Sequence, residues 1–232
     1  MKKLFKDIKL FNKVYNLHTT NVYACFLDAS KAFDKVNHWH LFKKLLYKGV
    51  PKLIVRLLMY WYISQQFAVK WCNVVSPFFT VSNGVRQGGV LSPVLYNLFI
   101  DDLSVQLMKS NVGCIMNDVR MNHLMYADDS VILAPSPSGL QKLLLICEKF
   151  ASDNELTFNA KKTKCMYFCT KSLYDIYVPS LTLNGNILAC VEQHNYLGVI
   201  LCSNQADDCD IYRQMKTLYA RGNILVCKLR SC

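Results

Sequence analysis

Tyr126-Ala127-Asp128-Asp129 is the stretch that indicates the fold of this chain, because it sets two adjacent carboxylates between two apolar runs. Leu124-Met125 precedes the acids, and Val131-Ile132-Leu133 follows them. Strands are poor in aspartate and adjacent like charges repel, so the pattern predicts a β-hairpin that presents both carboxylates at its tip. A bound divalent metal would relieve the repulsion, whereas solvated turn aspartates are the ordinary explanation of such a pair.

The composition is that of a folded, basic protein. The chain has 232 residues, 52% of them apolar, and a mean hydropathy of +0.14, which suits one large domain or two small subdomains with a sizeable core. Lysine and arginine number 27 against 16 acidic residues, a net charge of +11. This balance favours a polyanionic partner such as nucleic acid or an acidic membrane, although a merely basic soluble protein is the plain alternative.

The cysteines and the apolar stretches argue against secretion and membrane insertion. Eleven cysteines, without a C-x-x-C pair or the paired Cys/His spacing of a zinc finger, predict buried, reduced thiols in an intracellular protein. The uncharged stretches 71–85 and 87–100 are interrupted by polar residues and fall short of the ~20 apolar residues of a spanning helix. The N-terminus lacks the apolar region of a signal peptide, so we expect no membrane span.

Periodicity and turn residues predict an α+β fold in which helices back an antiparallel sheet. The expected strands cover residues 23–28, 67–71, 78–81, 164–168 and 196–201, besides those of the acidic hairpin and a second hairpin around Asn184-Gly185. The expected helices run from about 31 to 48, 51 to 66, 92 to 109 and 138 to 154, with a last one from Asp207-Asp208. Ser92-Pro93 is expected as N-cap and first turn, and Asn117-Asp118 as part of a loop.

Asp28 ends the first strand, about a hundred residues before the acidic hairpin. A sheet that pairs these elements would bring three carboxylates together, and such a cluster can hold two hard cations. Two Mg²⁺ ions roughly 3.5–4 Å apart activate an attacking hydroxyl and stabilise the leaving group of an in-line phosphoryl transfer. The basic charge makes nucleic acid the expected substrate.

Five segments, in order and with matching spacing, resemble the motifs of reverse transcriptases. Phe26-Leu27-Asp28-Ala29-Ser30-Lys31-Ala32-Phe33-Asp34, Gly84-Val85-Arg86-Gln87-Gly88 through Leu91-Ser92-Pro93, and Tyr126 to Asp129 look like motifs A, B and C. Asn159-Ala160-Lys161-Lys162-Thr163-Lys164 is similar to motif D, and Tyr196-Leu197-Gly198 resembles motif E. The residues of these motifs are most similar to those of non-LTR (LINE-like) retrotransposon polymerases, and the resemblance runs from about Tyr23 to the C-terminus.

The resemblance implies an RNA-directed DNA polymerase, a nucleotidyltransferase with the palm of a right-hand polymerase. It implies two Mg²⁺ ions, with Mn²⁺ as a possible substitute, and RNA template, DNA primer and dNTP as partners. No particular oligomeric state follows. Asp28 and Asp128 would be metal ligands, Asp129 the third carboxylate of the catalytic cluster and a ligand with them, and the carbonyl of Ala29 a further ligand.

The same resemblance implies roles for the residues around the incoming nucleotide. Phe33 would be an aromatic gate against a ribose 2′-hydroxyl, or else a residue packed into the core. Gln87 and Gly88 would abut the nucleotide, Gly88 because a missing side chain permits close approach. Arg86 would contact phosphate or template, or be a surface cation. Lys162 would protonate the departing pyrophosphate.

Several assignments have competitors. Lys161 and Lys164 compete with Lys162, and all three suit a solvated basic turn. Tyr196-Leu197-Gly198 would grip the primer end, although an apolar strand with a glycine bulge also explains it. A basic stripe in the last helix would follow the template-primer backbone or be a solvated face: Arg213, Lys216 and Arg221.

The remaining acids and histidines are expected to be structural or solvated. Asp101-Asp102 should face water, Asp34 should brace its turn, and three acids should serve a helix N-terminus: Asp207, Asp208 and Asp210. His38 and His40 lie two apart, so on a helix they cannot converge on one metal.

The expected layout is a remnant of fingers at 1–22, a palm with part of the fingers at 23–201, and the start of a thumb or a connecting helix at 202–232. A truncated, inactive retroelement relic that at most binds nucleic acid is the alternative, and a group II intron maturase is a lesser variant. The resemblance implies a location in the nucleus, in a cytoplasmic ribonucleoprotein, or in both.

Overall fold

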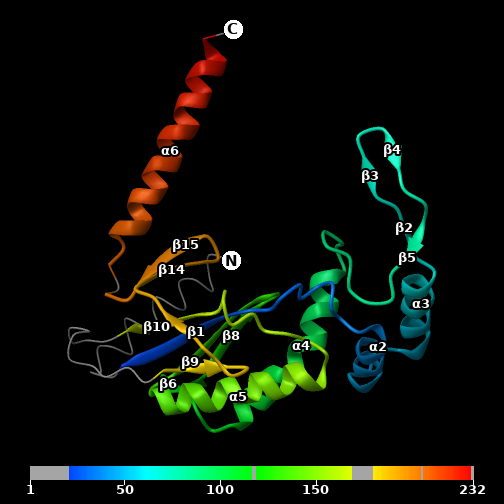
Figure 1. Cartoon of the computed structure of the whole chain (residues 1–232), viewed down its shortest axis with the longest axis horizontal. Helices are drawn as coiled ribbons and strands as arrows, with labels where there is room; N and C mark the ends of the chain where they lie inside the picture. The colour runs from blue at the N-terminus through cyan, green and yellow to red at the C-terminus, as the bar shows by residue number, and fades with distance from the viewer. Residues whose placement is uncertain (1–20, 117–118, 169–179, 205, 231–232) are drawn as a thin grey trace.

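A five-stranded sheet forms the centre of the molecule, in the order β13-β10-β1-β9-β8 (Figure 1). The computed structural model describes residues 21–116, 119–168, 180–204 and 206–230. The strands of the sheet are β1 (Val22–Asp28), β8 (His123–Tyr126), β9 (Asp129–Ala134), β10 (Lys164–Phe168) and β13 (Ala189–Cys190). All neighbours pair antiparallel except β10 and β13, which are parallel. The predicted antiparallel sheet is confirmed.

The central strand β1 is buried on both faces, which explains its nearly continuous apolar sequence. Tyr23, Cys25 and Leu27 point into one core and Val22, Ala24 and Phe26 into the other, since successive side chains of a strand alternate. Helices α4 (Ser92–Lys109) and α5 (Pro137–Asp153) cover the first face, and the hairpin of β14 (Gln193–Tyr196) and β15 (Val199–Cys202) lies on the second (Figure 1). The predicted backing of the sheet by helices is confirmed.

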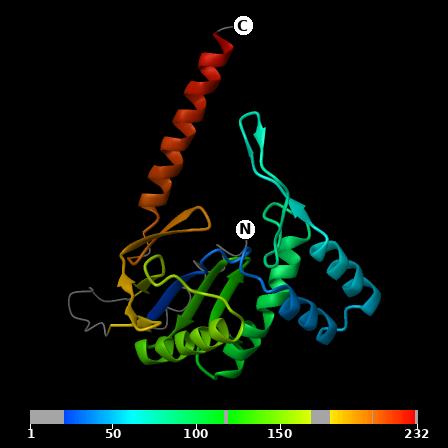
Figure 2. The same ribbon diagram turned by 45° about the vertical axis from the view of Figure 1, so that its right-hand side comes forward.

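Two projections extend toward the side of the molecule on which β14 and β15 lie (Figure 2). One follows α2 (His38–Tyr47) and α3 (Lys52–Ile63) and is a narrow arm, in which β2 (Gln66–Phe67) pairs with β5 (Phe79–Thr80) and β3 (Lys70–Trp71) with β4 (Val74–Val75). The other is α6 (Asp208–Leu229). The remaining hairpins join β6 (Cys114–Met116) to β7 (Val119–Met121), and β11 (Thr182–Leu183) to β12 (Asn186–Ile187).

Buried thiols lie at the centre of the first core. Cys25 and Cys165 face each other across β1 and β10, and Cys147 reaches the same core from α5. All three are almost completely buried, as expected, whereas Cys72 at the tip of the β3–β4 arm is exposed. Burial raises the pKa of the Cys147 thiol to about 12, and burial together with Cys165 raises the pKa of Cys25.

Several predicted elements are confirmed. The helix over 92–109, the strand over 164–168 and the Asn184-Gly185 turn lie where expected, with both turn residues at positive φ (50° and 73°). The last helix begins at Asp208 with Asp207 as its N-cap residue. The Asn117-Asp118 loop and most of the segment 1–22 lie outside the described residues.

Three local predictions are wrong. The first helix begins at His38 rather than near 31, because Lys31 has φ of 52° and the Asn37 side chain caps the helix by accepting from the amides of Trp39 and His40. Ser92 is the first residue of α4, not its N-cap. The strand predicted over 196–201 is interrupted by the two-residue turn Leu197-Gly198, which joins β14 to β15.

Among the described residues, no helix combines the length and the apolar character needed to cross a membrane.

Candidate active site

The strand register brings the three predicted carboxylates to one edge of the sheet. Asp28 is the last residue of β1 and lies directly opposite Asp129, the first residue of β9. Tyr126 and Asp129 close the β8–β9 hairpin, so Asp128 sits in its two-residue turn after Ala127, which has φ of 53°. The predicted acidic hairpin is confirmed.

The three carboxylates interact electrostatically. Burial raises the pKa of Asp129 above its ordinary value, and the charges of Asp128 and Asp28 raise it further. Aspartate oxygens are the hard donors that Mg²⁺ prefers, so the donor chemistry fits this ion. In the part of the chain that the structure describes, no three His, Cys, Asp or Glu side chains form a finished ligand cluster. The backbone therefore brings the three carboxylates to one edge of the sheet, but without a metal ion their side chains do not form a complete coordination shell.

The motif D segment is bonded along the end of β1. The Asp28 amide donates to Thr163 Oγ1 (3.2 Å), and the Asn159 amide donates to the Asp28 carbonyl (2.8 Å). Ala29 forms an isolated antiparallel bridge with Phe158. These bonds fix the end of β1 against the segment that carries the candidate lysines, and the metal-ligand role of the Ala29 carbonyl stays a prediction.

A cavity of about 180 Å³ lies beside the carboxylates, between this segment and the β14–β15 hairpin. Its polar lining is Asp28, Asp129, Lys162, His194, Asn195 and Tyr196. Lys162 is the motif D lysine that lines it, whereas Lys164 Nζ donates to the Lys161 carbonyl (3.0 Å). This placement favours Lys162 over its two competitors for contact with a ligand at the carboxylates.

A second cavity, of about 480 Å³, lies on the Asp128 side and is lined by Phe33, Gln87, Gly88, Gly89, Ser92, Pro93 and Asp128. The Phe33 ring is half-buried and stacks on the buried Tyr96 ring, with centroids 4.9 Å apart and planes at 26°. The same ring thus packs on the core and faces the cavity. Both interpretations of Phe33 from the sequence describe part of its environment.

The motif B loop is held against the motif A turn. Gln87 Nε2 donates to Asp34 Oδ1 (3.1 Å), which gives Asp34 the bracing role expected of it. Gly84 has φ of 94°, and a Cβ there would lie 2.9 Å from the Asp34 carbonyl oxygen. Gly88 also needs its positive φ of 81°, but the space beside it is open. Gln87 and Gly88 therefore line the second cavity from a constrained loop.

The Arg86 side chain lies away from the two cavities beside the carboxylates. Its guanidinium lies over the rings of Trp61 (5.9 Å) and Phe67 (5.5 Å), and its Nε donates to Gln65 Oε1 (3.1 Å). It lines a third cavity of about 400 Å³ at the base of the β2–β5 arm. Arg86 is thus an exposed residue whose guanidinium is held by these contacts, and it lines neither cavity beside the carboxylates.

The three motif E residues lie in different environments, and their primer-grip role stays a prediction. Tyr196 lines the first cavity, whereas Leu197 and Gly198 form the hairpin turn and do not line it. His194 and Asn195 line it instead, and we did not predict them. The His194 ring packs on Phe26, and burial followed by the charge of Lys164 lowers the pKa of His194. Two-residue spacing from Tyr196 along a strand is the signal that would have indicated His194.

Several charged residues have partners that the sequence did not indicate. Asp101 and Asp102 are exposed to water, as expected, and they also form ion pairs with Lys48 and Lys44. Asp210 is buried and pairs with Arg213, so it is more than a solvated helix-terminal acid.

Arg213 consequently does not belong to an exposed basic stripe on α6. Lys216 and Arg221 remain on exposed positions of that helix, with the Lys216 ammonium 4.5 Å from the Tyr212 ring centroid. His38 is structural, as expected, since it is buried and its Nε2 lies 2.7 Å from the Gly84 carbonyl oxygen.

Comparison with solved structures supports the polymerase palm. Apo telomerase from Candida tropicalis, truncated from its C-terminal domain, matches 89% of this chain and 39% of its own with a TM-score of 0.60 and 13% identity. Telomerase from the same organism, in complex with a fragment of telomeric RNA, matches 89% of this chain and 32% of its own with a TM-score of 0.59 and 12% identity. At these identities the likeness concerns the fold alone.

Sequence comparison gives the family. The chain is 32% identical over 188 residues to the RNA-directed DNA polymerase from mobile element jockey of Drosophila funebris, covering 77% of this chain and 19% of that protein. It is 34% identical over 145 residues to the Pol polyprotein from retrotransposable element R2DM of Drosophila melanogaster, covering 62% and 14%. The chain thus spans less than a fifth of either relative. The family described as reverse transcriptase (RNA-dependent DNA polymerase) matches residues 2–201, and the chain belongs to this family.

Proposed function

We propose that this chain is the catalytic palm region of an RNA-directed DNA polymerase of a non-LTR retrotransposon, which adds deoxynucleotides to a primer 3′-hydroxyl. One observation carries the proposal: the register of β1 and β9 sets Asp28 opposite Asp129, with Asp128 in the adjoining turn. The layout that goes with it is a part of the fingers at 1–22, a palm with a further part of the fingers at 23–201, and the start of a thumb or a connecting helix at 202–232. An intracellular location, in the nucleus or a cytoplasmic ribonucleoprotein, is part of the proposal.

Asp28, Asp128 and Asp129, with the Ala29 carbonyl, would hold two Mg²⁺ or Mn²⁺ ions. Bound there, the ions would activate the primer hydroxyl and neutralise the charge that develops on the triphosphate. Their ligands come from one strand end and one tight turn, so the backbone gathers the donors at one edge of the sheet before any substrate arrives.

The two cavities flanking the carboxylates suit the two substrates. Phe33 and Gln87 line the larger cavity beside Asp128, where the proposal places the dNTP with the Phe33 ring against the ribose 2′ position. Lys162 lines the smaller cavity with Asp28 and Asp129, where its ammonium is available as a proton donor. Tyr196 lines that cavity from the hairpin and would contact the primer end.

RNA template and DNA primer are the proposed macromolecular substrates. The charge of +11 supports a polyanionic partner. The telomerase of similar fold in complex with a fragment of telomeric RNA supports an RNA partner in particular. Arg86, which lines the cavity at the base of the β2–β5 arm, would contact the template.

Primer extension tests the proposal. The 232-residue chain is given a DNA primer on an RNA template, with Mg²⁺ and dNTPs. We expect Asp128→Asn to abolish incorporation, while Asp153→Asn, an exposed aspartate at the end of α5, serves as the matched control. Equal incorporation by the wild type and Asp128→Asn would contradict the catalytic assignment. Salt-sensitive nucleic-acid binding without incorporation would favour the inactive relic instead.

A further inference from the structure

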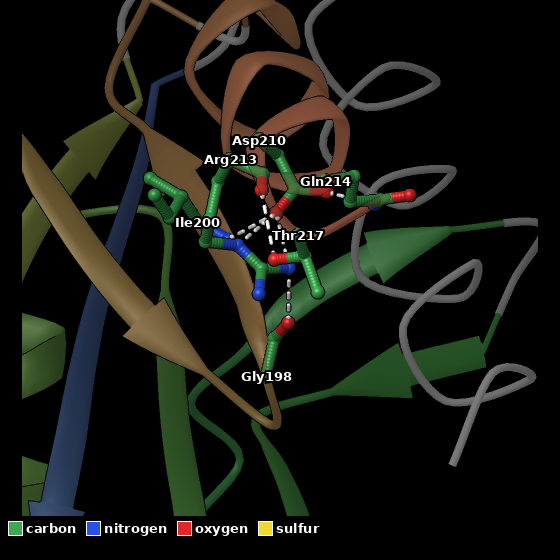
Figure 3. A network of polar contacts seen from close by, with 6 residues as sticks. All are labelled: Gly198, Ile200, Asp210, Arg213, Gln214 and Thr217. Atoms are coloured by element: carbon green, nitrogen blue, oxygen red, sulfur yellow. Dashed lines mark hydrogen bonds and ion pairs between the residues drawn. The ribbon is translucent and has the colours of Figure 1, made fainter. Parts of the chain in front are cut away.

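The base of α6 contains a buried carboxylate with a full set of partners. Asp210 is 5% exposed and is the buried residue of α6, within the part of the helix that the structure describes. Its Oδ1 accepts from the Ile200 amide (3.0 Å) and from Arg213 Nε (3.1 Å) and Nη2 (2.8 Å), and its Oδ2 accepts from Gln214 Nε2 (2.5 Å) (Figure 3). A buried carboxylate with this many hydrogen bonds has a structural role and is not a solvated acid.

Arg213 carries the connection from the helix to the hairpin turn. Its Nη2 also donates to the Gly198 carbonyl (2.6 Å), so one guanidinium bridges Asp210 and the turn (Figure 3). Leu197 and Gly198 both have positive φ (49° and 78°). The planar guanidinium presents its donors in a fixed fork, so bonds to two acceptors fix their relative placement more tightly than a lysine would.

The hairpin held in this way forms one wall of the smaller cavity beside the carboxylates. His194, Asn195 and Tyr196 precede the bridged turn directly, and they face Asp28 and Asp129 across the cavity. The Tyr196 hydroxyl is buried and has no hydrogen-bond partner within the described segments. The position of Tyr196 therefore depends on packing and on the hairpin backbone rather than on a bond at its own tip.

We propose that Asp210 and Arg213 are positioning residues that lock the β14–β15 hairpin to α6 and so hold the His194–Tyr196 wall in place over the catalytic carboxylates. The catalytic consequence rests on the function proposed above. The competing role for Arg213 is a direct contact with a nucleic-acid phosphate, for which a lysine would serve nearly as well.

Three variants separate the two roles. Arg213→Lys keeps the charge but loses the fork, Arg213→Ala loses both, and Asp210→Asn keeps an acceptor for the Ile200 amide but loses the charge that holds Arg213. Arg230→Ala removes an arginine at the exposed far end of α6 and is the matched control. Thermal unfolding of each variant shows whether the chain still folds.

The first readout needs no activity. Amide hydrogen exchange is followed over residues 193–202 of the 232-residue chain without substrates. We expect exchange across the hairpin to accelerate about 10-fold or more in all three variants, because each disrupts the Arg213 bridge between Asp210 and Gly198, and to stay unchanged in Arg230→Ala. Exchange that stays at the wild-type rate in Arg213→Lys and Asp210→Asn would overturn the lock.

The second readout is primer extension resolved into kcat and KM. A misplaced cavity wall lowers kcat by about 10- to 100-fold, with little change in KM for dNTP, since alignment rather than binding is lost. We expect this loss in Arg213→Lys as well as in Arg213→Ala. Wild-type kinetics in Arg213→Lys would instead support a phosphate contact and overturn the positioning role.

The two readouts also distinguish the failure of this inference from that of the proposed function. Accelerated exchange with unchanged kcat would overturn the positioning role and leave the polymerase intact. Absence of incorporation by the wild-type chain would contradict the proposed function. In that case the exchange rates alone would show whether Asp210 and Arg213 lock the hairpin to α6.

Discussion

Asp129 carries an electrostatic cost in the metal-free protein. Its pKa is raised by burial and by the charges of Asp128 and Asp28. A folded-state pKa above the unfolded value of about 3.9 means that the folded chain binds this proton more readily. The contribution of Asp129 to stability therefore increases as the pH falls through its raised pKa, and it is unfavourable at neutral pH.

Asp128→Asn should consequently stabilise the metal-free chain while it abolishes activity. Removing one of the clustered charges should raise the free energy of unfolding at pH 7 by up to about 1 kcal/mol, the scale of a like-charge pair on neighbouring strands in contact with solvent. The gain should shrink at acidic pH, where Asp129 is protonated. Urea denaturation in a chelator measures it, against Asp153→Asn as control. A variant less stable than the wild type at pH 7 would show that Asp128 makes favourable contacts.

Phe33 is the residue on which sugar selection should depend. Phe33→Val removes the ring that stacks on Tyr96 and lines the cavity beside Asp128. We expect the preference for dNTP over rNTP in single-nucleotide incorporation to fall by about 10- to 100-fold, equivalent to roughly 1.4–2.7 kcal/mol. Phe78→Val, at an exposed phenylalanine of the β2–β5 arm, is the control. Retained dNTP incorporation with an unchanged preference would leave Phe33 a packing role only.

Among the elements, those specified by local signals were predictable from the sequence. The helix over 92–109 has proline in its first turn, and Asn184-Gly185 supplies the two positive φ angles of a tight hairpin turn. The start of the first helix was not predictable from local signals, because the turn before it is fixed by hydrogen bonds from a loop that is distant in the sequence. The Gly84 amide donates to the Val36 carbonyl and the Val85 amide to the Phe33 carbonyl. Nothing local in the sequence records those bonds.

The candidate site also contains residues that local sequence signals predict and residues that they do not. Asp28 and Asp128-Asp129 were predictable, since each ends or begins an apolar strand and the register follows from pairing those strands. The Leu197-Gly198 turn lies inside an apolar run, and an apolar run of this length predicts a continuous strand. The helical spacing of Arg213 with Lys216 and Arg221 predicts a basic stripe, whereas the i,i+3 spacing of Asp210 and Arg213 is the signal for the ion pair that the structure shows.

At the base of α6, the Asp210 network should make the helix anchor sensitive to acid. Burial opposes ionisation of Asp210, but hydrogen bonds from the Ile200 amide, Arg213 and Gln214 outweigh it and lower its pKa. This stabilisation is present above the unfolded pKa of about 3.9 and is lost as the pH falls through the lower folded value. We expect Asp210→Asn to cost about 1–3 kcal/mol at pH 7 and progressively less in acid. Equal losses at pH 7 and pH 2, measured by urea denaturation, would contradict this.

At the scale of the whole molecule, two projections flank the edge of the sheet that carries the carboxylates (Figure 2). The β2–β5 arm stands on one side and α6 on the other, and α5 covers the opposite face of the sheet. A duplex placed against the carboxylates would lie between the projections. Basic residues on α6 would therefore lie beside this duplex, whereas those on α5 lie on the opposite face of the sheet.

Salt dependence should distinguish the two positions. Each phosphate contact contributes a slope of about −0.9 to the dependence of log affinity on log salt for a DNA duplex, and less for a single strand. Lys216→Ala on α6 should reduce the magnitude of the slope by roughly 1, and Lys142→Ala, on an exposed position of α5, should leave it unchanged. Fluorescence anisotropy with a primer-template duplex at several salt concentrations measures both. An unchanged slope in Lys216→Ala would remove α6 from the nucleic-acid surface.

The cysteines in the first core have a practical consequence. Alkylating reagents attack the thiolate, and Cys25, Cys147 and Cys165 are enclosed, with the pKa values of Cys25 and Cys147 raised. They can react only when the sheet and α5 separate, whereas Cys72 on the arm is accessible at all times. Mass-resolved labelling of the native chain therefore measures how often the core opens, with Cys72 as the internal standard, and it needs neither substrate nor denaturant.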